Sequence, residues 1–362
     1  MACKRDKCPG PKEQALVSFR WATTLRGRGG GVMRTRCFRA SRFCARGPSG
    51  AALAMALAAR ALPLDARGHA GRGAAFVLLL TLVASVGQAE EAKDPGARSR
   101  RIDTEHLFGF VIGTDVGNVG DKEVEAEVTS GFGKRPGSYA AFAPSLEYEF
   151  VPIDNLRLAP SVISAVHSIS GVDGIDDRQQ AAFDGLSFDV RYRILDRSRS
   201  GVGLTLNAEP HWGLVDETSG QWVDRYGADF AIAVDHELVP DRVIAAINLL
   251  YQPETSRLHT TGVWTRDATA GIAAGLMVQV FPGVLIGGEG RQLWKYEGIG
   301  LDRISGRAFF VGPTMYARLT ARSWMIAAWG AQAAGRAVET PGALDVTNFT
   351  RYQAKIQFGL EF

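Results

Sequence analysis

Apolar and polar side chains alternate in the stretch Tyr352-Gln353-Ala354-Lys355-Ile356-Gln357-Phe358-Gly359-Leu360-Glu361-Phe362. Successive side chains of a β-strand point to opposite faces, so a strand here would have one apolar face and one polar face. The apolar face would consist of Ala354, Ile356, Phe358, Leu360 and Phe362. We therefore predict that residues 348–362 form a strand whose apolar face contacts an apolar medium.

The same alternation recurs upstream of this stretch. In one segment, for example, Leu186, Phe188 and Val190 alternate with polar residues, and Gly-, Pro- and Asp-rich breaks separate the segments. Segments of about 10 residues with this alternation are typical of membrane-spanning strands. The pattern predicts 12 strands, near residues 106–116, 139–150, 156–167, 182–195, 201–214, 225–238, 242–252, 267–281, 283–296, 306–321, 324–335 and 348–362.

Short and long connections alternate between the predicted strands. The long ones lie near residues 117–138, 168–181, 215–224, 253–266, 297–305 and 336–347. Outer-membrane barrels have short periplasmic turns and longer outer loops, and an even number of strands returns both ends to the periplasmic side. The sequence thus predicts an all-β chain that forms a single closed, antiparallel, transmembrane β-barrel of about 12 strands in up-and-down meander order.

A secretory leader precedes the barrel. Residues 74–86 form a short apolar run after Arg67 and Arg72, and the small residues that follow predict cleavage after Ala89. We expect residues 1–89 to be a leader, residues 90–105 a periplasmic tail and residues 106–362 the barrel. The basic, Gly- and Ala-rich start of the leader indicates that translation begins downstream, with Met33 and Met55 as candidates.

Removing the leader changes the charge of the protein. The whole chain carries 41 basic and 38 acidic side chains, a net charge of +3, but 15 of the basic and 3 of the acidic ones lie in the leader. The mature part is therefore acidic, which argues against a nucleic-acid partner. All four cysteines lie in the leader as well, so the mature part offers no disulfide, thiol nucleophile or cysteine-ligated metal.

Closure of the sheet is the physical reason to expect a membrane barrel. Backbone polar groups in hydrocarbon need internal partners, so only helices and edge-free barrels span a bilayer. A soluble β protein, the alternative, would turn its apolar faces inward. Aromatic residues near strand ends favour the membrane, because such rings suit the headgroup zone. They are Phe150, Tyr192, Phe281 and Trp324 toward short connections, and Trp212, Tyr226, Tyr251, Trp264, Trp294 and Tyr296 toward long ones.

Two stretches carry a resemblance to known families. Residues 352–362 resemble the C-terminal signal of Gram-negative outer-membrane β-barrel proteins, which implies that Ile356, Phe358, Leu360 and Phe362 are read by the barrel-assembly machinery. The size, the strand number and the stretch Phe309–Arg318 resemble uncharacterised transporter barrels and those associated with the MetA pathway of phenol degradation. That resemblance implies passage of small, aromatic or hydrophobic solutes and supplies no site residues.

Placing the apolar faces in lipid assigns the polar faces to the lumen. The predicted lumen-lining residues, which would contact a solute, are Glu147, Asp189, Arg191, Glu209, His211, Asp229, Glu289, Arg291, Arg318 and Lys355. Opposed charges across a narrow pore would orient polar solutes. Equally, the same residues would form salt bridges that satisfy a closed interior. Small residues on both faces of residues 268–290 would make room for a substrate or a second barrel, or allow strands to approach closely.

Catalysis and metal binding have little support in the sequence. His167 and Ser161 share a strand face but lie about 20 Å apart along it, and no Gly-x-Ser-x-Gly motif occurs. Asp173, Asp176 and Asp177 fit a solvated loop better than a calcium site. We therefore predict no enzyme activity, no catalytic residue, no metal and no cofactor.

The sequence best fits a narrow pore or transporter for small solutes in the cell outer membrane. The alternatives are a non-conducting structural or surface-interaction barrel that acts through its outer loops, and an outer-membrane hydrolase. The expected partners are outer-membrane lipid, the assembly machinery and small-molecule solutes. We expect a monomer, since trimeric porins usually fold a long loop inward and no predicted connection here is longer than the 22 residues of 117–138.

Overall fold

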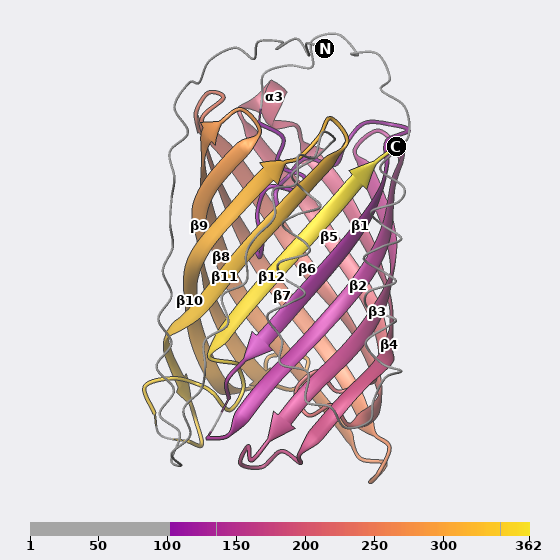
Figure 1. Cartoon of the computed structure of the whole chain (residues 1–362), viewed down its shortest axis with the longest axis vertical. Helices are drawn as coiled ribbons and strands as arrows, with labels where there is room; N and C mark the ends of the chain where they lie inside the picture. The colour runs from indigo at the N-terminus through magenta and orange to yellow at the C-terminus, as the bar shows by residue number, and fades with distance from the viewer. Residues whose placement is uncertain (1–101, 135, 341) are drawn as a thin grey trace, which may run out of the picture. The chain divides into compact units, whose positions relative to one another are not determined.

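The fold is a closed β-barrel (Figure 1). The structure, a computed structural model, describes residues 102–362 except 135 and 341, so the predicted leader and its cleavage site lie outside the described residues. The strands are β1 Lys122–Phe132, β2 Ser138–Ile153, β3 Leu156–Ser170, β4 Arg178–Leu195, β5 Val202–Val215, β6 Trp222–Val239, β7 Val243–Leu258, β8 Trp264–Phe281, β9 Val284–Glu297, β10 Arg303–Arg318, β11 Ser323–Ala337 and β12 Tyr352–Glu361. A single helical turn, α3 Arg197–Ser200, connects β4 and β5.

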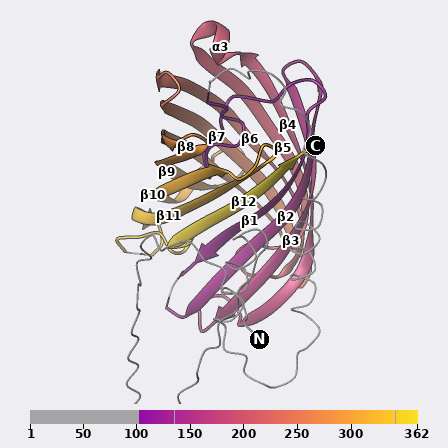
Figure 2. The same ribbon diagram turned by 45° about the horizontal axis from the view of Figure 1, so that its top comes forward.

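Each strand pairs with its sequence neighbours, and β1 pairs with β12 to close the ring. All pairs are antiparallel; in the closing pair, Val128 faces Ile356 and Thr129 faces Lys355. The predicted fold class, a meander of 12 strands in one closed barrel, is therefore confirmed. In Figure 2 the ring is turned so that one opening comes forward, the opening beside α3 and the C-terminus.

The eleven strands predicted after residue 138 are found, but the first strand was placed wrongly. Residues 106–116 are not a strand, and β1 instead lies inside the segment 117–138 that was expected to be a long loop. Residues 106–116 are apolar on both faces, since Leu107 and Phe108 are adjacent and Phe110, Val111 and Ile112 follow one another, whereas β1 alternates. In β1, Glu123, Glu125 and Glu127 alternate with valine and alanine, and this polar face lines the inside of the barrel.

The connections fall at two ends of the barrel. The short-turn end contains α3 and the connections at 154–155, 240–242, 282–283 and 319–322, and the long-loop end contains residues 338–351. Several other predicted long loops are shorter in the structure, because strands such as β7 and β8 continue well into them. The lengths of the connections therefore distinguish the two ends of the barrel less clearly than the sequence predicted.

The outer face of the barrel is apolar. Outward side chains of the central strands are large, and about half of the surface of Leu186, Ile247 and Leu249 is exposed, whereas inward neighbours such as Asp189 and Asn248 are buried. A folded chain does not leave a continuous band of this kind in water, and a lipid-facing barrel requires it. The aromatic belt includes Tyr192 and Phe281, both exposed as predicted. Trp324 is an exception, because it is 1% exposed and points inward.

None of the helices in the described part of the chain has the length and apolar character needed to cross a bilayer.

The outward band can be tested with two arginine substitutions at similarly exposed positions. Leu249, in the middle of β7, is 51% exposed, and Val263, in the connection to β8, is 57% exposed. If the band lies in lipid, Leu249→Arg should lower the free energy of unfolding by ~2–4 kcal/mol. Val263→Arg should change it by less than ~0.5 kcal/mol. Urea unfolding in lipid vesicles measures both, and equal effects would contradict a membrane-spanning wall.

Candidate functional site

Residues 102–117 lie inside the barrel, and the exposed residues 118–121 connect them to β1; we call residues 102–121 the inner segment. Figures 1 and 2 show this indigo stretch within the ring of strands, toward the short-turn end. Thr104 and Val116 are completely buried and Leu107 is 1% exposed. The sequence predicted a periplasmic tail up to residue 105 and a first strand at 106–116. In the structure, residues 102–116 instead form a stretch without a strand inside the barrel. Their apolar side chains meet the inner wall of the barrel rather than lipid.

The inner segment packs on an apolar stretch of wall. Leu107, Phe108 and Val111 form one buried cluster with inward side chains of β7 to β11, namely Ile244, Ala246, Ala273, Met277, Leu285, Tyr316, Trp324 and Ile326. Burying a side chain of this size contributes about 1.5–3 kcal/mol. The lumen thus has a largely apolar wall on β7–β11, which the simple assignment of polar faces to the lumen did not foresee.

Small wall residues make room for the inner segment. A Cβ atom on Gly275 would lie 2.7 Å from the ring of Phe108, and one on Gly109 would overlap Ala328. The small residues of β8 and β9 were expected to make room for a substrate or a second barrel, or to allow close approach of the backbone. In the structure, Gly275 allows the wall to approach the inner segment closely. The sequence shows that these residues are small, but it does not show that the inner segment packs against them.

Polar side chains of the wall hold the backbone of the inner segment. The Glu289 carboxylate accepts hydrogen bonds from the backbone N–H groups of Gly109 at 2.6 Å and Phe110 at 2.7 Å. It also accepts one from Thr314 at 2.7 Å. Asn248 accepts from the N–H of Ile112 at 2.6 Å and donates to its carbonyl at 2.8 Å. These bonds satisfy backbone groups that no neighbouring strand pairs.

Arg197 in α3 clamps the start of the inner segment at the short-turn end. Its guanidinium lies 2.8 Å from both Asp115 and Asp235 and donates to the carbonyl of Ile102 at 2.6 Å. Burial lowers the pKa of Arg197, but the Asp115 and Asp235 carboxylates outweigh it, so the pKa lies above its usual value. This role could not be predicted from the sequence, because Arg197 lies in a short polar connection that is typical of a solvated turn.

Acidic residues of β1 and β2 form the opposite wall beside the inner segment. In register, Glu123 faces Glu149 and Glu125 faces Glu147. Like charges placed directly opposite each other destabilise a sheet unless a counter-charge compensates them.

Arg157 of β3 provides part of that counter-charge. It is 1% exposed and lies 2.8 Å from Glu149, 3.5 Å from Glu147, 3.6 Å from Asp189 and 3.8 Å from Glu105.

His106 of the inner segment reaches the same acidic wall. Burial alone would lower its pKa, but the carboxylates of Glu125, Glu149 and Glu123 outweigh burial and raise it. Its ring also stacks on Trp324, with centroids 4.4 Å apart and an interplanar angle of 14°. Sequence analysis missed His106, Glu123 and Arg157 as lumen groups. For Glu123 the signal existed, in the alternation of β1.

The predicted lumen residues lie on β2, β4–β6, β9, β10 and β12. Arg191 lies 3.4 Å from Asp189, and Glu209 accepts a 2.7 Å hydrogen bond from Ser187. Asp229 faces Glu209 in register, and His211 lies 3.8 Å from Glu254.

On the remaining strands, Lys355 pairs with Glu127 at 2.8 Å and Arg318 lies 3.7 Å from Glu361. Arg291 differs from the rest, because its guanidinium lies 3.9 Å from the ring centre of Phe110 in the inner segment. Glu289 and Arg291 thus contact the inner segment, while the other residues mainly pair within the wall. Contact of any of them with a solute stays a prediction.

The long-loop end is narrowed by residues 338–351. Asp345 is fully buried, and its backbone N–H donates to the Gln332 side chain at 2.6 Å. Phe349 packs edge-on against Phe310, an inward residue of β10, with ring centroids 6.2 Å apart. Tyr139 at the start of β2 donates to the carbonyl of Thr218 at 3.0 Å, so another connection, 216–221, also turns inward. Residues 338–351 and 216–221 thus form hydrogen bonds with the wall at this opening.

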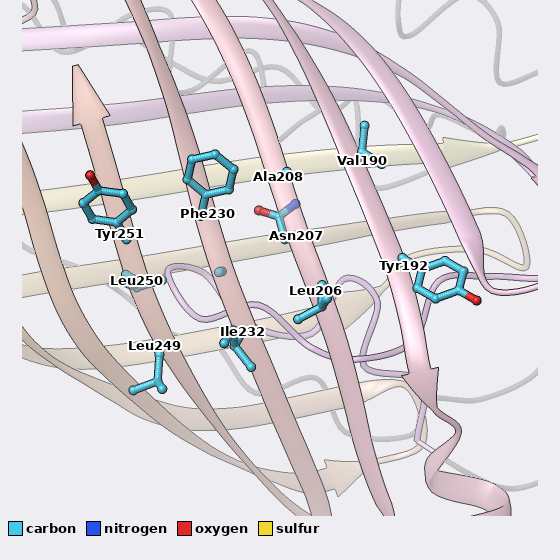
Figure 3. A pocket seen from close by; sticks show the side chains of 11 residues that line it. Val190, Tyr192, Leu206, Asn207, Ala208, Phe230, Ile232, Leu249, Leu250 and Tyr251 are labelled. Carbon is cyan, nitrogen blue, oxygen red and sulfur yellow. The ribbon is translucent and has the colours of Figure 1, made fainter. Parts of the chain in front are cut away.

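The outer wall carries a shallow apolar hollow of about 480 Å³ across β4–β7 (Figure 3). Ala208 lies in it among larger side chains, including Tyr192, Phe230 and Tyr251. It is a depression in the surface that faces lipid, and it holds no group suited to catalysis.

His167 and Ser161, the pair considered from the sequence, do not contact each other. His167 bonds to the backbone carbonyl of Glu217 at 2.9 Å, and Ser161 bonds instead to Ser187 at 2.6 Å. Nucleophilic catalysis needs the hydroxyl and its base within hydrogen-bond reach. The absence of enzyme activity stays a prediction.

Comparisons with known proteins give a matching family model and several distant structural neighbours. Residues 100–362 match the model of a family of unknown function, DUF6662. No curated protein matches the sequence. A COG4313 outer membrane channel from Pseudomonas putida F1 is 14% identical, with a TM-score of 0.48, covering 75% of this chain and 100% of the channel.

Two further solved structures are more distant. The NanC porin is 11% identical, with a TM-score of 0.39, covering 67% of this chain and 100% of the porin. The toluene transporter TbuX of Ralstonia pickettii is 8% identical, with a TM-score of 0.33, covering 68% of this chain and 90% of the transporter.

Arg157 offers a test of the acidic wall. Arg157→Ala would leave buried carboxylates without their counter-charge and should lower the free energy of unfolding by about 3–5 kcal/mol. Arg199→Ala is the matched control, because this side chain is 88% exposed, and its effect should stay within ~0.5 kcal/mol. Denaturant unfolding followed by tryptophan fluorescence measures both. A change below 1 kcal/mol for Arg157→Ala would mean that the wall does not depend on it.

Proposed function

We propose that this chain, which belongs to the DUF6662 family of unknown function, is a passage for small solutes through the outer membrane that the inner segment keeps closed. The apolar outer face supports a membrane location, and the predicted signal for the assembly machinery supports the outer membrane. Two residues of that signal, Ile356 and Phe362, lie exposed on the outer face, 56% and 61% respectively. The protein would act as a monomer after export.

The observation that carries the proposal is that the lumen accommodates a separate stretch of backbone. Eight-stranded barrels are filled by their own side chains, whereas wider barrels enclose a channel or a plugged interior. Here the inner segment lies between the acidic wall of β1–β2 and the apolar wall of β7–β11. If the inner segment moves, the space that it occupies becomes a passage.

The contacts of the inner segment are suited to a closure that can be released. It adds no strand to the barrel, so the ring remains closed without it. Glu289, Asn248 and Arg197 hold it through hydrogen bonds and ion pairs. A hydrogen bond to a charged group contributes only about 1.5–3 kcal/mol net. A few such contacts keep the lumen closed at rest, while the rigid wall is unaffected by their loss.

The two walls also indicate a class of solute. An opened passage would expose acidic and basic groups such as Glu147, Asp189 and Arg157 on one side. On the other side it would expose Phe310, Tyr316 and Trp324. Opposed charges orient a polar group in a pore, and aromatic rings accept an apolar body. We propose small amphipathic organic molecules as the solutes.

A non-conducting barrel is the second candidate, and one observation favours it. Thr104, Thr114 and Val116 of the inner segment are completely buried, which is the burial of a structural core. In that case the inner segment would be a permanent filling, and the exposed loops would perform the function.

Conductance in planar bilayers separates the two candidates. Glu289→Ala with Asn248→Ala removes the backbone anchors of the inner segment. The expected result is at least a tenfold rise in mean conductance over the wild type, because the lost anchors contribute about 1.5–3 kcal/mol for the charged one alone. The matched control is Glu209→Ala with Asn207→Ala. It removes the same two side-chain types from wall positions whose partners are Ser187 and Asp189, and it should leave conductance within about twofold.

Deleting residues 102–121 gives the decisive comparison. The ring of strands remains complete, and heat-dependent gel mobility shows whether it has folded. A folded deletion variant that conducts no more than bare lipid would exclude the pore and leave the structural barrel.

A further inference from the structure

His106 of the inner segment lies among carboxylates that come from separate parts of the chain. Its Nδ1 atom is 2.9 Å from Glu125 of β1, within hydrogen-bond distance. Its Nε2 atom is 3.4 Å from Glu123 of β1 and 3.7 Å from Glu149 of β2. Trp324 covers one face of the ring, so the imidazole is fixed in orientation.

The two sides of the imidazole differ in geometry. The Nδ1 contact is an ordinary hydrogen bond, whereas 3.4 and 3.7 Å exceed normal N–H···O distances. Donor atoms around a tetrahedral ion with bonds of 2.0–2.1 Å are separated by about 3.3–3.4 Å. A histidine that binds a metal usually donates its other ring N–H to a carboxylate. Nε2 is therefore spaced as a ligand, and Glu125 occupies the place of the orienting carboxylate.

Glu123 gives independent support. Its side chain is 7% exposed, and its Oε1 atom, like Nε2 of His106, has no hydrogen-bond partner among the described residues. A buried carboxylate without a partner is costly. The donor atoms of His106, Glu123 and Glu125 all lie within 4.8 Å of one another, and so do those of Glu105, His106 and Glu149.

Carboxylates outnumber basic side chains at this junction, even with His106 counted beside Arg157. Glu105, Glu123, Glu125, Glu147 and Glu149 all lie at this junction, and Glu123–Glu149 and Glu125–Glu147 are direct cross-strand neighbours. Arg157 is the basic residue that pairs with Glu149 there, at 2.8 Å. Since Glu149 is shared with Arg157, Glu123 is the stronger ligand of the two.

We propose that this junction binds a divalent transition-metal ion such as Zn²⁺, with His106 Nε2 and Glu123 as the ligands and Glu125 orienting the imidazole. Glu105 and Glu149 form a separate group with His106 and would contribute negative charge near the ion rather than bonds to it. One imidazole with several carboxylates suits Zn²⁺ or Mn²⁺ better than a soft ion. The bound ion would join the inner segment to β1 and β2. The sequence predicted no metal site because the residues of the junction are spread over residues 105–149 and two of them fall in the supposed tail and first strand.

Isothermal titration of the detergent-folded full chain with ZnCl₂ tests the site directly, whether or not the barrel conducts. The protein used for the titration carries no polyhistidine tag. Each variant differs from the wild type by one side chain, so any Zn²⁺ bound by the leader cysteines is the same in every sample. We expect micromolar or tighter binding at this site and release of protons as His106 loses its proton. Both His106→Gln and Glu123→Gln should weaken the binding at least tenfold. Glu125→Gln should weaken it 10- to 100-fold.

His259→Gln is the matched control, since His259 is an exposed histidine paired with Asp224 at the long-loop end, and it should bind as the wild type does. Glu123→Gln keeps the shape of the side chain and breaks no hydrogen bond, so it remains informative if His106→Gln fails to fold. No Zn²⁺ binding by the wild type up to 1 mM, or binding unchanged within twofold in Glu123→Gln, would overturn the proposal. In either case His106 would serve as a protonated partner of the carboxylates.

Discussion

Closure of the sheet between β1 and β12 is the constraint on which the rest of the structure depends. Every strand has two neighbours once the ring is complete, so the backbone of the wall needs no partner from lipid or water. This frees the outward side chains to be uniformly apolar. It also creates an interior that no strand fills, because 12 strands enclose more space than their own side chains occupy.

The inner segment fills part of this interior and pairs with groups of the wall. Its apolar side chains cover the apolar wall on β7–β11, and its backbone takes hydrogen bonds from Glu289 and Asn248. Its charged groups, Glu105, His106 and Asp115, meet opposed charges on β1, β3 and α3. Function and stability therefore concern the same contacts, since whatever opens the lumen must replace them.

Most of the wall could be predicted from the sequence because its alternation reflects a real difference between lipid and lumen. The inner segment could not, since an apolar stretch such as residues 107–112 fits a buried strand and a buried segment inside the ring equally well. A period of two shows that a stretch has two faces but not which medium each face contacts. Trp324 was misplaced for the same reason, because an aromatic residue near a strand end suits the headgroup zone or the lumen equally. The alternation predicted a set of lumen residues, but not their partners, such as Arg157 for Asp189, because these depend on register across strands.

The position of the inner segment, ahead of β1 in the chain, has a consequence for the order of folding. Its hydrogen bonds to Glu289 span about 180 residues of sequence, and the pairing of β1 with β12 spans more. Contacts between residues so distant in sequence form slowly, because the intervening chain must first be brought together. The inner segment and β1, which precede the other strands in the chain, therefore meet their partners on β9 and β12 last. Until then Leu107, Phe108 and Val111 remain uncovered, so the unfinished barrel exposes an apolar stretch that the closed ring later buries.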